Sequence, residues 1–136
     1  MRYLLDTNVL LHVVNKAAGY EHIERRLIVA PANSLLVSVI SVWEIFRMAE
    51  KAKVPSKASK AALEFLDEFR IVPMTKPGAA LGGQIHAVLS KIGQTIGERD
   101  SMIAGIALLN NYILVTDNVG EMQRVAGLTV ENWRSH

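Results

Sequence analysis

The 136-residue sequence contains no cysteine, which excludes disulfide bonds and thiolate metal ligands. It also lacks any apolar run of about 18 residues, the length that a membrane helix needs. The acidic residue Asp6 comes too early for an N-terminal signal peptide. We therefore expect a soluble, cytoplasmic protein without a membrane partner.

The sequence also has no large excess of positive or negative charge. Fifteen Lys and Arg against 13 Asp and Glu leave a formal net charge of +2, and the basic residues are spread along the chain. This balance is compatible with nucleic-acid binding but does not establish it. A basic surface has to be assembled by folding or by dimerisation.

Apolar residues, in contrast, make up 50% of the sequence and charged residues only 21%. A chain near 150 residues buries about 68–70% of its unfolded surface, so a sizeable core is expected and disorder is not. Repeats, low-complexity tracts and long Pro- or Gly-rich linkers are missing. The sequence predicts one domain over residues 1–136.

Short apolar segments alternate with longer amphipathic ones, a pattern typical of an α/β fold with a mostly parallel sheet. We expect a central sheet of four to five strands flanked by helices. The predicted strands are residues 3–5, 35–39, 71–73, 112–115 and 128–130. Pro73 favours an edge position for the third of them.

Three of the predicted helices bear on function. Ser41 is expected to start a helix whose buried stripe is Val42, Ile45, Phe46 and Ala49. Pro77 opens a helix in which the pair Gly82-Gly83 costs helix stability in exchange for close packing. A further helix, rich in Ala, Ile and Leu, covers residues 98–110.

Four acidic residues occupy junctions between these elements. Asp6 and Asp117 each end an apolar strand, Asp100 opens an apolar helix, and Glu44 is placed in the first turn after the second strand. In an open parallel sheet the carboxyl ends of the strands share one edge, where ligands bind. The four carboxylates are therefore expected to converge.

Carboxylates brought together in a partly buried crevice repel one another and raise each other's pKa. A divalent cation relieves that repulsion, and hard oxygen ligands favour Mg²⁺ or Mn²⁺. A metal site made only of carboxylates suits phosphate-ester chemistry, with one ion or with two ions about 3.5–4 Å apart.

Each acid also has a structural interpretation. Asp6 can cap the first helix, and Glu44 completes a capping box, Ser41-x-x-Glu44. Asp100 can stabilise the N-terminus of a helix by interacting with the helix dipole, and Asp117 can be an ordinary turn residue. Their shared position on one predicted edge favours the metal site.

Five segments carry a resemblance to a known family. Residues 4–10 (Leu-Leu-Asp-Thr-Asn-Val-Leu), 38–45, 96–104 and 114–118 resemble the four motifs of PIN domains. Residues 125–133 resemble the C-terminal strand of VapC toxins. The resemblance spans essentially the whole chain. It implies a Mg²⁺- or Mn²⁺-dependent endoribonuclease that cleaves tRNA or rRNA, forms a homodimer and is inhibited by a small VapB-like antitoxin.

The fourth motif departs from the usual pattern. Many PIN domains carry an acid two residues after Thr116, where this sequence has Asn118, and the acid is Asp117 instead. Some VapC-like sequences place a glutamate a few residues further on, which is Glu121 here. The resemblance therefore leaves Asp117, Asn118 and Glu121 open as the fourth ligand, and Glu98 is an outer acid.

We expect Asp6 and Asp100 to hold the main ion, with Glu44 as a further ligand, directly or through water. Asp117 is expected to complete the site or to orient a bound water.

Supporting residues are also expected. Thr7, Asn8 and Thr116 are predicted to donate hydrogen bonds that fix the carboxylates, and Arg99 to contact the RNA backbone. The histidines show no metal-binding spacing and are given no catalytic role; they are His12, His22, His86 and His136.

Other interpretations are considered as well. A receiver domain needs paired acids after the first strand, and an Asp-x-Asp phosphatase needs a carboxylate where Asn8 stands. A non-catalytic PIN-like module that binds RNA or protein remains the alternative function. Trp43 and Met48 lie off the predicted buried stripe; core packing is the default interpretation, and an exposed apolar patch there would mark a partner surface, which we expect the antitoxin to use.

Overall fold

The computed structural model describes residues 1–135, so His136 lies outside the described residues. Five strands are present in this part of the chain: β1 (Tyr3–Leu5), β2 (Leu35–Ser38), β3 (Arg70–Val72), β4 (Ile113–Val115) and β5 (Val130–Glu131). The helices are α1 (Thr7–Val14), α2 (Tyr20–Val29), α3 (Val39–Glu50), α4 (Pro55–Leu66), α5 (Lys76–Lys91), α6 (Glu98–Asn110) and α7 (Val119–Met122).

The strands form one sheet in the order β3-β2-β1-β4-β5, and every neighbouring pair is parallel. This confirms the predicted α/β class, and β3 occupies an edge as Pro73 indicated. The chain runs outward from β1 to β3 on one side and returns to β4 on the other. The strand order thus reverses between the neighbours β1 and β4, and an open α/β sheet binds ligands beyond the carboxyl ends of the strands at such a reversal.

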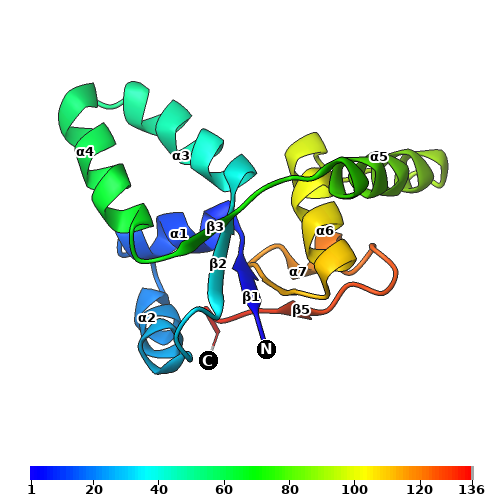
Figure 1. The fold of residues 1–136 in the computed structure, drawn as a ribbon, viewed down its shortest axis with the longest axis horizontal. Coiled ribbons are helices and arrows are strands. Elements are labelled where there is room, and N and C mark those ends of the chain that lie inside the picture. The colour runs from blue at the N-terminus through cyan, green and yellow to red at the C-terminus, as the bar shows by residue number, and fades with distance from the viewer. Residues whose placement is uncertain (136) are drawn as a thin grey trace.

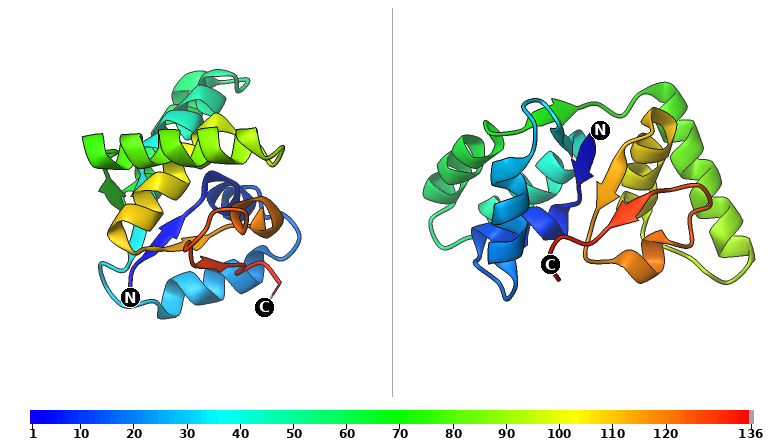
Figure 2. Two further views of the ribbon diagram at one scale, coloured as in Figure 1. Left: turned by 90° about the vertical axis from the view of Figure 1, so that its right-hand side faces the viewer. Right: turned by 90° about the horizontal axis from the view of Figure 1, so that it is seen from below.

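Helices cover both faces of the sheet (Figures 1 and 2). One core cluster joins the sheet to α5, α6 and α7, and the other joins it to α1, α2, α3 and α4. Alternate strand residues divide between the two faces, as the period-2 geometry of strands requires. Leu4, Leu36 and Leu114 face the first group, and Leu5, Val37 and Val115 face the second. The result is an α/β/α sandwich.

The α5–α6 contact depends on glycine. A Cβ on Gly82 would lie 2.9 Å from the backbone oxygen of Ser101, and one on Gly105 would lie 2.7 Å from that of Gly78. Gly83 has no atom within 4 Å of such a Cβ. The predicted exchange of helix stability for close packing is therefore confirmed for Gly82 and wrong for Gly83.

No helix among residues 1–135 is both long enough and apolar enough to cross a membrane.

Candidate active site

Asp6 lies at the centre of the sheet's carboxyl edge. Its backbone N–H donates to the carbonyl of Val115 on β4, at 2.9 Å, immediately after β1 ends. Asp6 is also the N-cap of α1, and its side chain is only 3% exposed. Asp6 caps α1 and also lies where β1 ends, so it can serve as the helix cap and still belong to a metal site.

Three neighbours fix the Asp6 carboxylate. Oδ1 accepts from the Thr7 backbone N–H at 2.8 Å. Oδ2 accepts from the Thr116 hydroxyl at 2.8 Å and, more weakly, from the Asn8 amide at 3.4 Å. These are the residues that the sequence indicated as donors, although Thr7 donates to Asp6 through its backbone rather than its hydroxyl.

Glu44 is held beside Asp6 through Thr7. The Thr7 hydroxyl lies 2.8 Å from Glu44 Oε1 and 2.8 Å from Ser41 Oγ. Since a carboxylate can only accept, Thr7 donates to Glu44 and accepts from Ser41. The other carboxylate oxygen, Oε2, accepts from Arg99 Nε at 3.2 Å. Glu44 is thus bonded from both α1 and α6.

The predicted start of α3 is wrong by two residues. Ser38 is the N-cap, and its hydroxyl oxygen accepts from the Ser41 backbone N–H at 3.2 Å. Because the helix begins at Val39, Glu44 belongs to its second turn and does not form a capping box with Ser41. The structural interpretation of Glu44 therefore fails, and its carboxylate is committed to Thr7 and Arg99.

Burial sets the electrostatics of Asp6. The pKa of its carboxyl is raised from 3.8 to about 6, mainly by desolvation and to a smaller extent by the negative charges of Asp100 and Glu44. The hydrogen bonds from Thr116 and Thr7 oppose this shift without cancelling it. Asp6, Asp100 and Glu44 are therefore close enough to repel one another.

Asp100 stands in the first turn of α6 and is partly buried. Burial is the main cause that raises its pKa, followed by the charges of Glu121 and Glu44. Arg99 opposes the shift. Glu121 thus belongs to the same group of interacting carboxylates.

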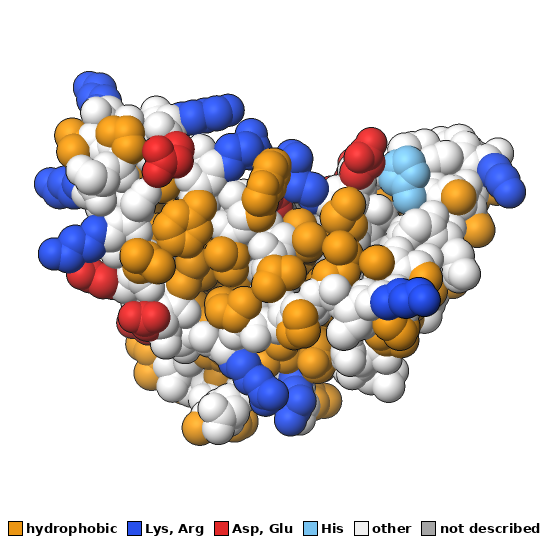
Figure 3. All heavy atoms as spheres, turned by 45° about the horizontal axis from the view of Figure 1, so that its top comes forward, with side chains coloured by type: hydrophobic (Ala, Val, Ile, Leu, Met, Phe, Trp, Pro, Cys, Tyr) orange, Lys and Arg blue, Asp and Glu red, His pale blue; other side chains and the backbone are white. Residues whose placement is uncertain are grey.

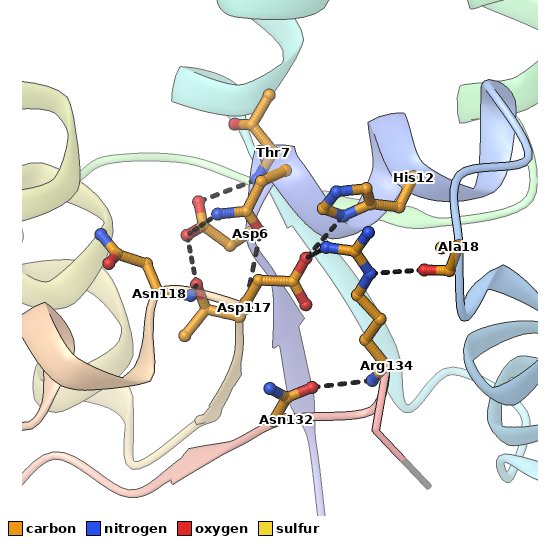
Figure 4. Close-up of polar contacts among 10 residues, drawn as sticks. Asp6, Thr7, His12, Ala18, Asp117, Asn118, Asn132 and Arg134 are labelled. Atoms are coloured by element: carbon orange, nitrogen blue, oxygen red, sulfur yellow. Dashed lines mark hydrogen bonds and ion pairs between the residues drawn. The ribbon is translucent and has the colours of Figure 1, made fainter.

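Asp117 turns away from this group. Its Oδ2 lies 2.6 Å from His12 Nδ1 and 3.3 Å from Arg134 Nη1. Figure 4 shows the carboxylates of Asp6 and Asp117 pointing in different directions. Asp117 is not among the charges that shift the pKa of Asp6 or Asp100. The structure brings Asp6, Glu44 and Asp100 together and leaves Asp117 outside.

The two other candidates for the fourth position are linked to Asp6. The Asn118 amide donates to Glu121 Oε2 at 2.7 Å, and its backbone N–H donates to Thr116 Oγ1 at 3.0 Å. Since Thr116 in turn donates to Asp6, one chain of hydrogen bonds connects Glu121 with Asp6. Asp117 is instead paired with His12, a residue to which the sequence gave no catalytic role.

A polar cleft of about 540 Å³ opens beside Glu44 and Asp100; it is lined by Glu44, Gly97, Glu98, Arg99 and Asp100. No three His, Asp or Glu side chains of residues 1–135 are close enough to hold one ion between them. Mg²⁺ is usually bound through one or two carboxylates and retains several waters. The mutual repulsion of the acids and their all-oxygen donors fit such a hard cation.

Comparison with known proteins agrees with this geometry. The family model of the PIN domain matches residues 3–128. The chain belongs to the PIN domain family. It is 37% identical to ribonuclease VapC2 of Haemophilus influenzae over 133 residues and 30% identical to the tRNA(fMet)-specific endonuclease VapC of Shigella flexneri over 134 residues. Each alignment covers 98% of both chains.

The fold likewise matches solved members of the family. The structure of DNA-bound VapBC from Salmonella typhimurium superposes with a TM-score of 0.87 at 30% identity, covering 98% of each chain. VapBC-1 of nontypeable Haemophilus influenzae matches with a TM-score of 0.86 at 28% identity and the same coverage.

Proposed function

We propose that this protein is a metal-dependent endoribonuclease that acts as the toxin of a VapBC toxin–antitoxin pair. The observation that carries the proposal is the group of interacting carboxylates at the carboxyl edge of β1, with the buried Asp6 at its centre. Its relatives named as VapC ribonucleases align over 98% of their length. Transfer RNA or ribosomal RNA is the expected substrate.

Asp6 and Asp100 would hold a Mg²⁺ or Mn²⁺ ion, with Glu44 as a further ligand, directly or through water. A bound cation supplies Lewis-acid polarisation of the scissile phosphate and lowers the pKa of water. Thr116 and the Thr7 backbone keep the Asp6 carboxylate in one orientation. The reaction is hydrolysis, in which water adds to phosphorus and a ribose oxygen leaves.

Glu121 is the fourth acid in this proposal. Its charge raises the pKa of Asp100, and Asn118 connects it to Thr116 beside Asp6. Asp117 then has a structural role, because its Oδ2 pairs with His12 and Arg134. Its other oxygen, Oδ1, is buried without a hydrogen-bond partner among residues 1–135.

Cleavage of total cellular RNA by purified protein, with Mg²⁺, Mn²⁺ or EDTA, tests the activity. Asp100→Asn should lower the rate by more than about 100-fold, since even the outer partners of metal ligands contribute about 10- to 100-fold. The exposed Asp67→Asn is the matched control and should cleave like the wild type. Folded wild-type protein that cleaves nothing under any metal condition would favour a non-catalytic binding module.

The same assay separates the candidates for the fourth acid. Glu121→Gln should lower metal-dependent cleavage by about 10- to 100-fold, whereas Asp117→Asn should leave the rate near the wild-type value. The reverse pattern would make Asp117 the ligand and would require its carboxylate to leave His12 when the ion binds.

A VapB-like antitoxin is the proposed protein partner. An apolar groove of about 480 Å³ lies between α1, α3 and α4 and offers no charged side chain; it is lined by Leu10, Leu11, Val14, Asn15, Ile45, Met48, Ala49, Ala52, Ala58, Ala61, Ala62 and Phe65. We call it the α1–α3–α4 groove. Its composition suits the apolar face of a helical segment. The VapBC structures that this fold matches contain both toxin and antitoxin.

Met48 and Trp43 do not share this surface, contrary to the single patch expected from the sequence. They are five positions apart on the helix, which is about 140° around the axis, and only Met48 lines the α1–α3–α4 groove. Ala61→Asp in the groove should abolish co-purification with a co-expressed VapB-like antitoxin, and Ala87→Asp on the exposed face of α5 should not. Equal co-purification of both variants would place the antitoxin elsewhere.

A homodimer is proposed on the resemblance to VapC proteins. Sedimentation equilibrium of the purified chain should give twice the monomer mass, and a monomer at all concentrations would contradict the proposal.

A further inference from the structure

Trp43 is the largest exposed apolar side chain next to the carboxylate group. Its side chain is 54% exposed, although it directly precedes Glu44 on α3. A tryptophan ring left in solvent at the border of an active site needs a physical reason, because its burial would contribute more to stability than that of any other side chain.

Two arginines stand at this ring. The guanidinium carbon of Arg47 lies 5.2 Å from the ring centroid, and that of Arg99 lies 5.4 Å from it. Arg47 makes no ion pair among residues 1–135. Arg99 uses Nε for Glu44, which leaves its two terminal nitrogens for another acceptor. The ring thus lies next to two guanidinium groups that can bind an anion.

A pocket of about 290 Å³ opens beside the ring, lined by Ile40, Trp43, Glu98, Arg99 and Met102. We call it the Trp43 pocket. It shares Glu98 and Arg99 with the polar cleft over Glu44 and Asp100. The Trp43 pocket therefore adjoins the polar cleft at Glu98 and Arg99, next to Glu44 and Asp100.

Figure 3 shows one face of the molecule, with apolar side chains gathered in its middle and Lys and Arg side chains, together with some Asp and Glu, around them. An aromatic ring, apolar walls and cationic groups together are how proteins bind single-stranded nucleic acid: bases stack on the ring and phosphates meet the cations.

We propose that Trp43 is a stacking platform for one base of the RNA strand, in the nucleotide next to the cleaved bond, and that Arg47 and Arg99 contact its flanking phosphates. The proposal rests on the ribonuclease function above. The incoming base takes the place of a guanidinium group at the ring. Cation–π contacts at exposed sites are weak, so the displaced arginine loses little and gains a phosphate.

Charge favours RNA over a second copy of this chain on this surface. An isologous contact uses the same patch on both copies, so a dimer centred on the Trp43 ring would bring Arg47 and Arg99 close to the same two arginines of the other copy. Glu98 is the only acid lining the Trp43 pocket. Arg47, which makes no ion pair among residues 1–135, is therefore a cation that a phosphate can neutralise.

The test compares two substitutions that differ only in stacking. Trp43→Phe retains an aromatic ring, and Trp43→Leu retains apolar bulk without one. Binding of a fluorescein-labelled single-stranded RNA of about 12 nucleotides is measured by anisotropy in Mg²⁺, with Asp100→Asn in every protein to prevent cleavage. Circular dichroism and the Tm confirm that each variant is folded.

Trp43→Leu should bind the RNA roughly 5- to 150-fold more weakly, the range measured when a stacking aromatic is removed, and Trp43→Phe should restore most of the affinity. An abasic oligonucleotide of equal length and charge should bind both variants alike. Arg99→Gln should weaken the binding of both oligonucleotides, because its contact is to phosphate.

Equal RNA affinity of Trp43→Leu and the Trp43 parent overturns the proposal, as does the absence of measurable RNA binding by that parent. The proposal is also overturned if Trp43→Leu and Trp43→Phe both bind RNA weakly and both lose the dimer in sedimentation. The surface around Trp43 would then be the interface between two copies of the chain. Metal-dependent cleavage by the protein with Asp100 intact is measured in parallel. This cleavage assay tests the ribonuclease function separately, so the ribonuclease proposal and the stacking proposal can fail independently.

Discussion

Replacing Asp6 by asparagine should stabilise the metal-free protein at neutral pH while it abolishes cleavage. Burial and the neighbouring carboxylates raise the pKa of Asp6 from 3.8 to about 6. For an acid this shift means that the folded state retains its proton more tightly than the unfolded state between these two values. Stability therefore falls as the pH rises through this range and stays at its lower level above it.

The size of the effect follows from the shift. A difference of roughly 2 pKa units, at about 1.4 kcal/mol each, costs about 3 kcal/mol once Asp6 is ionised in both states. Solvent screening scarcely reduces this figure because the side chain is 3% exposed. The asparagine amide carries no charge, so the variant avoids the cost while keeping hydrogen-bonding groups opposite Thr116 and Thr7.

Urea denaturation in EDTA at about pH 4.5 and about pH 7.5 measures the difference. The stability advantage of Asp6→Asn over the wild type should grow by about 2 kcal/mol between the two conditions. Asp67→Asn, at an exposed position, should show no such growth. Mg²⁺ at neutral pH should raise the Tm of the wild type and leave that of Asp6→Asn nearly unchanged. An advantage that stays constant with pH would refute the claim that a buried charge destabilises this site.

Two further predictions concern packing around the site. Gly82→Ala should lower the free energy of unfolding by roughly 1–3 kcal/mol, because its Cβ would press on the backbone of Ser101 next to the carboxylates. Gly83→Ala, facing open space, should raise it by roughly 0.5–1 kcal/mol; equal Tm shifts would disprove the packing role of Gly82. Arg134→Met should cost about 1 kcal/mol of stability in urea denaturation, by removing a partly exposed ion pair with Asp117, and a cleavage rate that fell with it would reopen Asp117 as a site residue.

Much of the fold could be predicted because its strands and helices follow from the residue pattern within each segment. The strand at residues 3–5 and the helix at residues 98–110 agree with β1 and α6. Apolar periodicity and a following acid specify such elements without knowledge of the rest of the chain. The start of α3 could not be predicted as well, because Ser38 and Ser41 are both suitable caps. The structure selects Ser38 as the cap, and the Ser41 hydroxyl contacts Thr7 of α1 instead.

The site divides in the same way. Convergence of Asp6, Glu44 and Asp100 follows from parallel strands that end at one edge. The direction of the Asp117 side chain does not, because it is decided by His12, 105 positions earlier, and by Arg134 in the C-terminal segment.

The sequence by itself determined an α/β chain with acids at the ends of its strands, since hydrophobic periodicity and residue type act over a few neighbouring positions. Only the tertiary structure decided which carboxylates repel one another and which glycine a neighbouring helix needs. It also separated Trp43, beside the carboxylates, from Met48 in the α1–α3–α4 groove. Side-chain directions and burial are set by contacts between segments distant in sequence, and no local pattern encodes them.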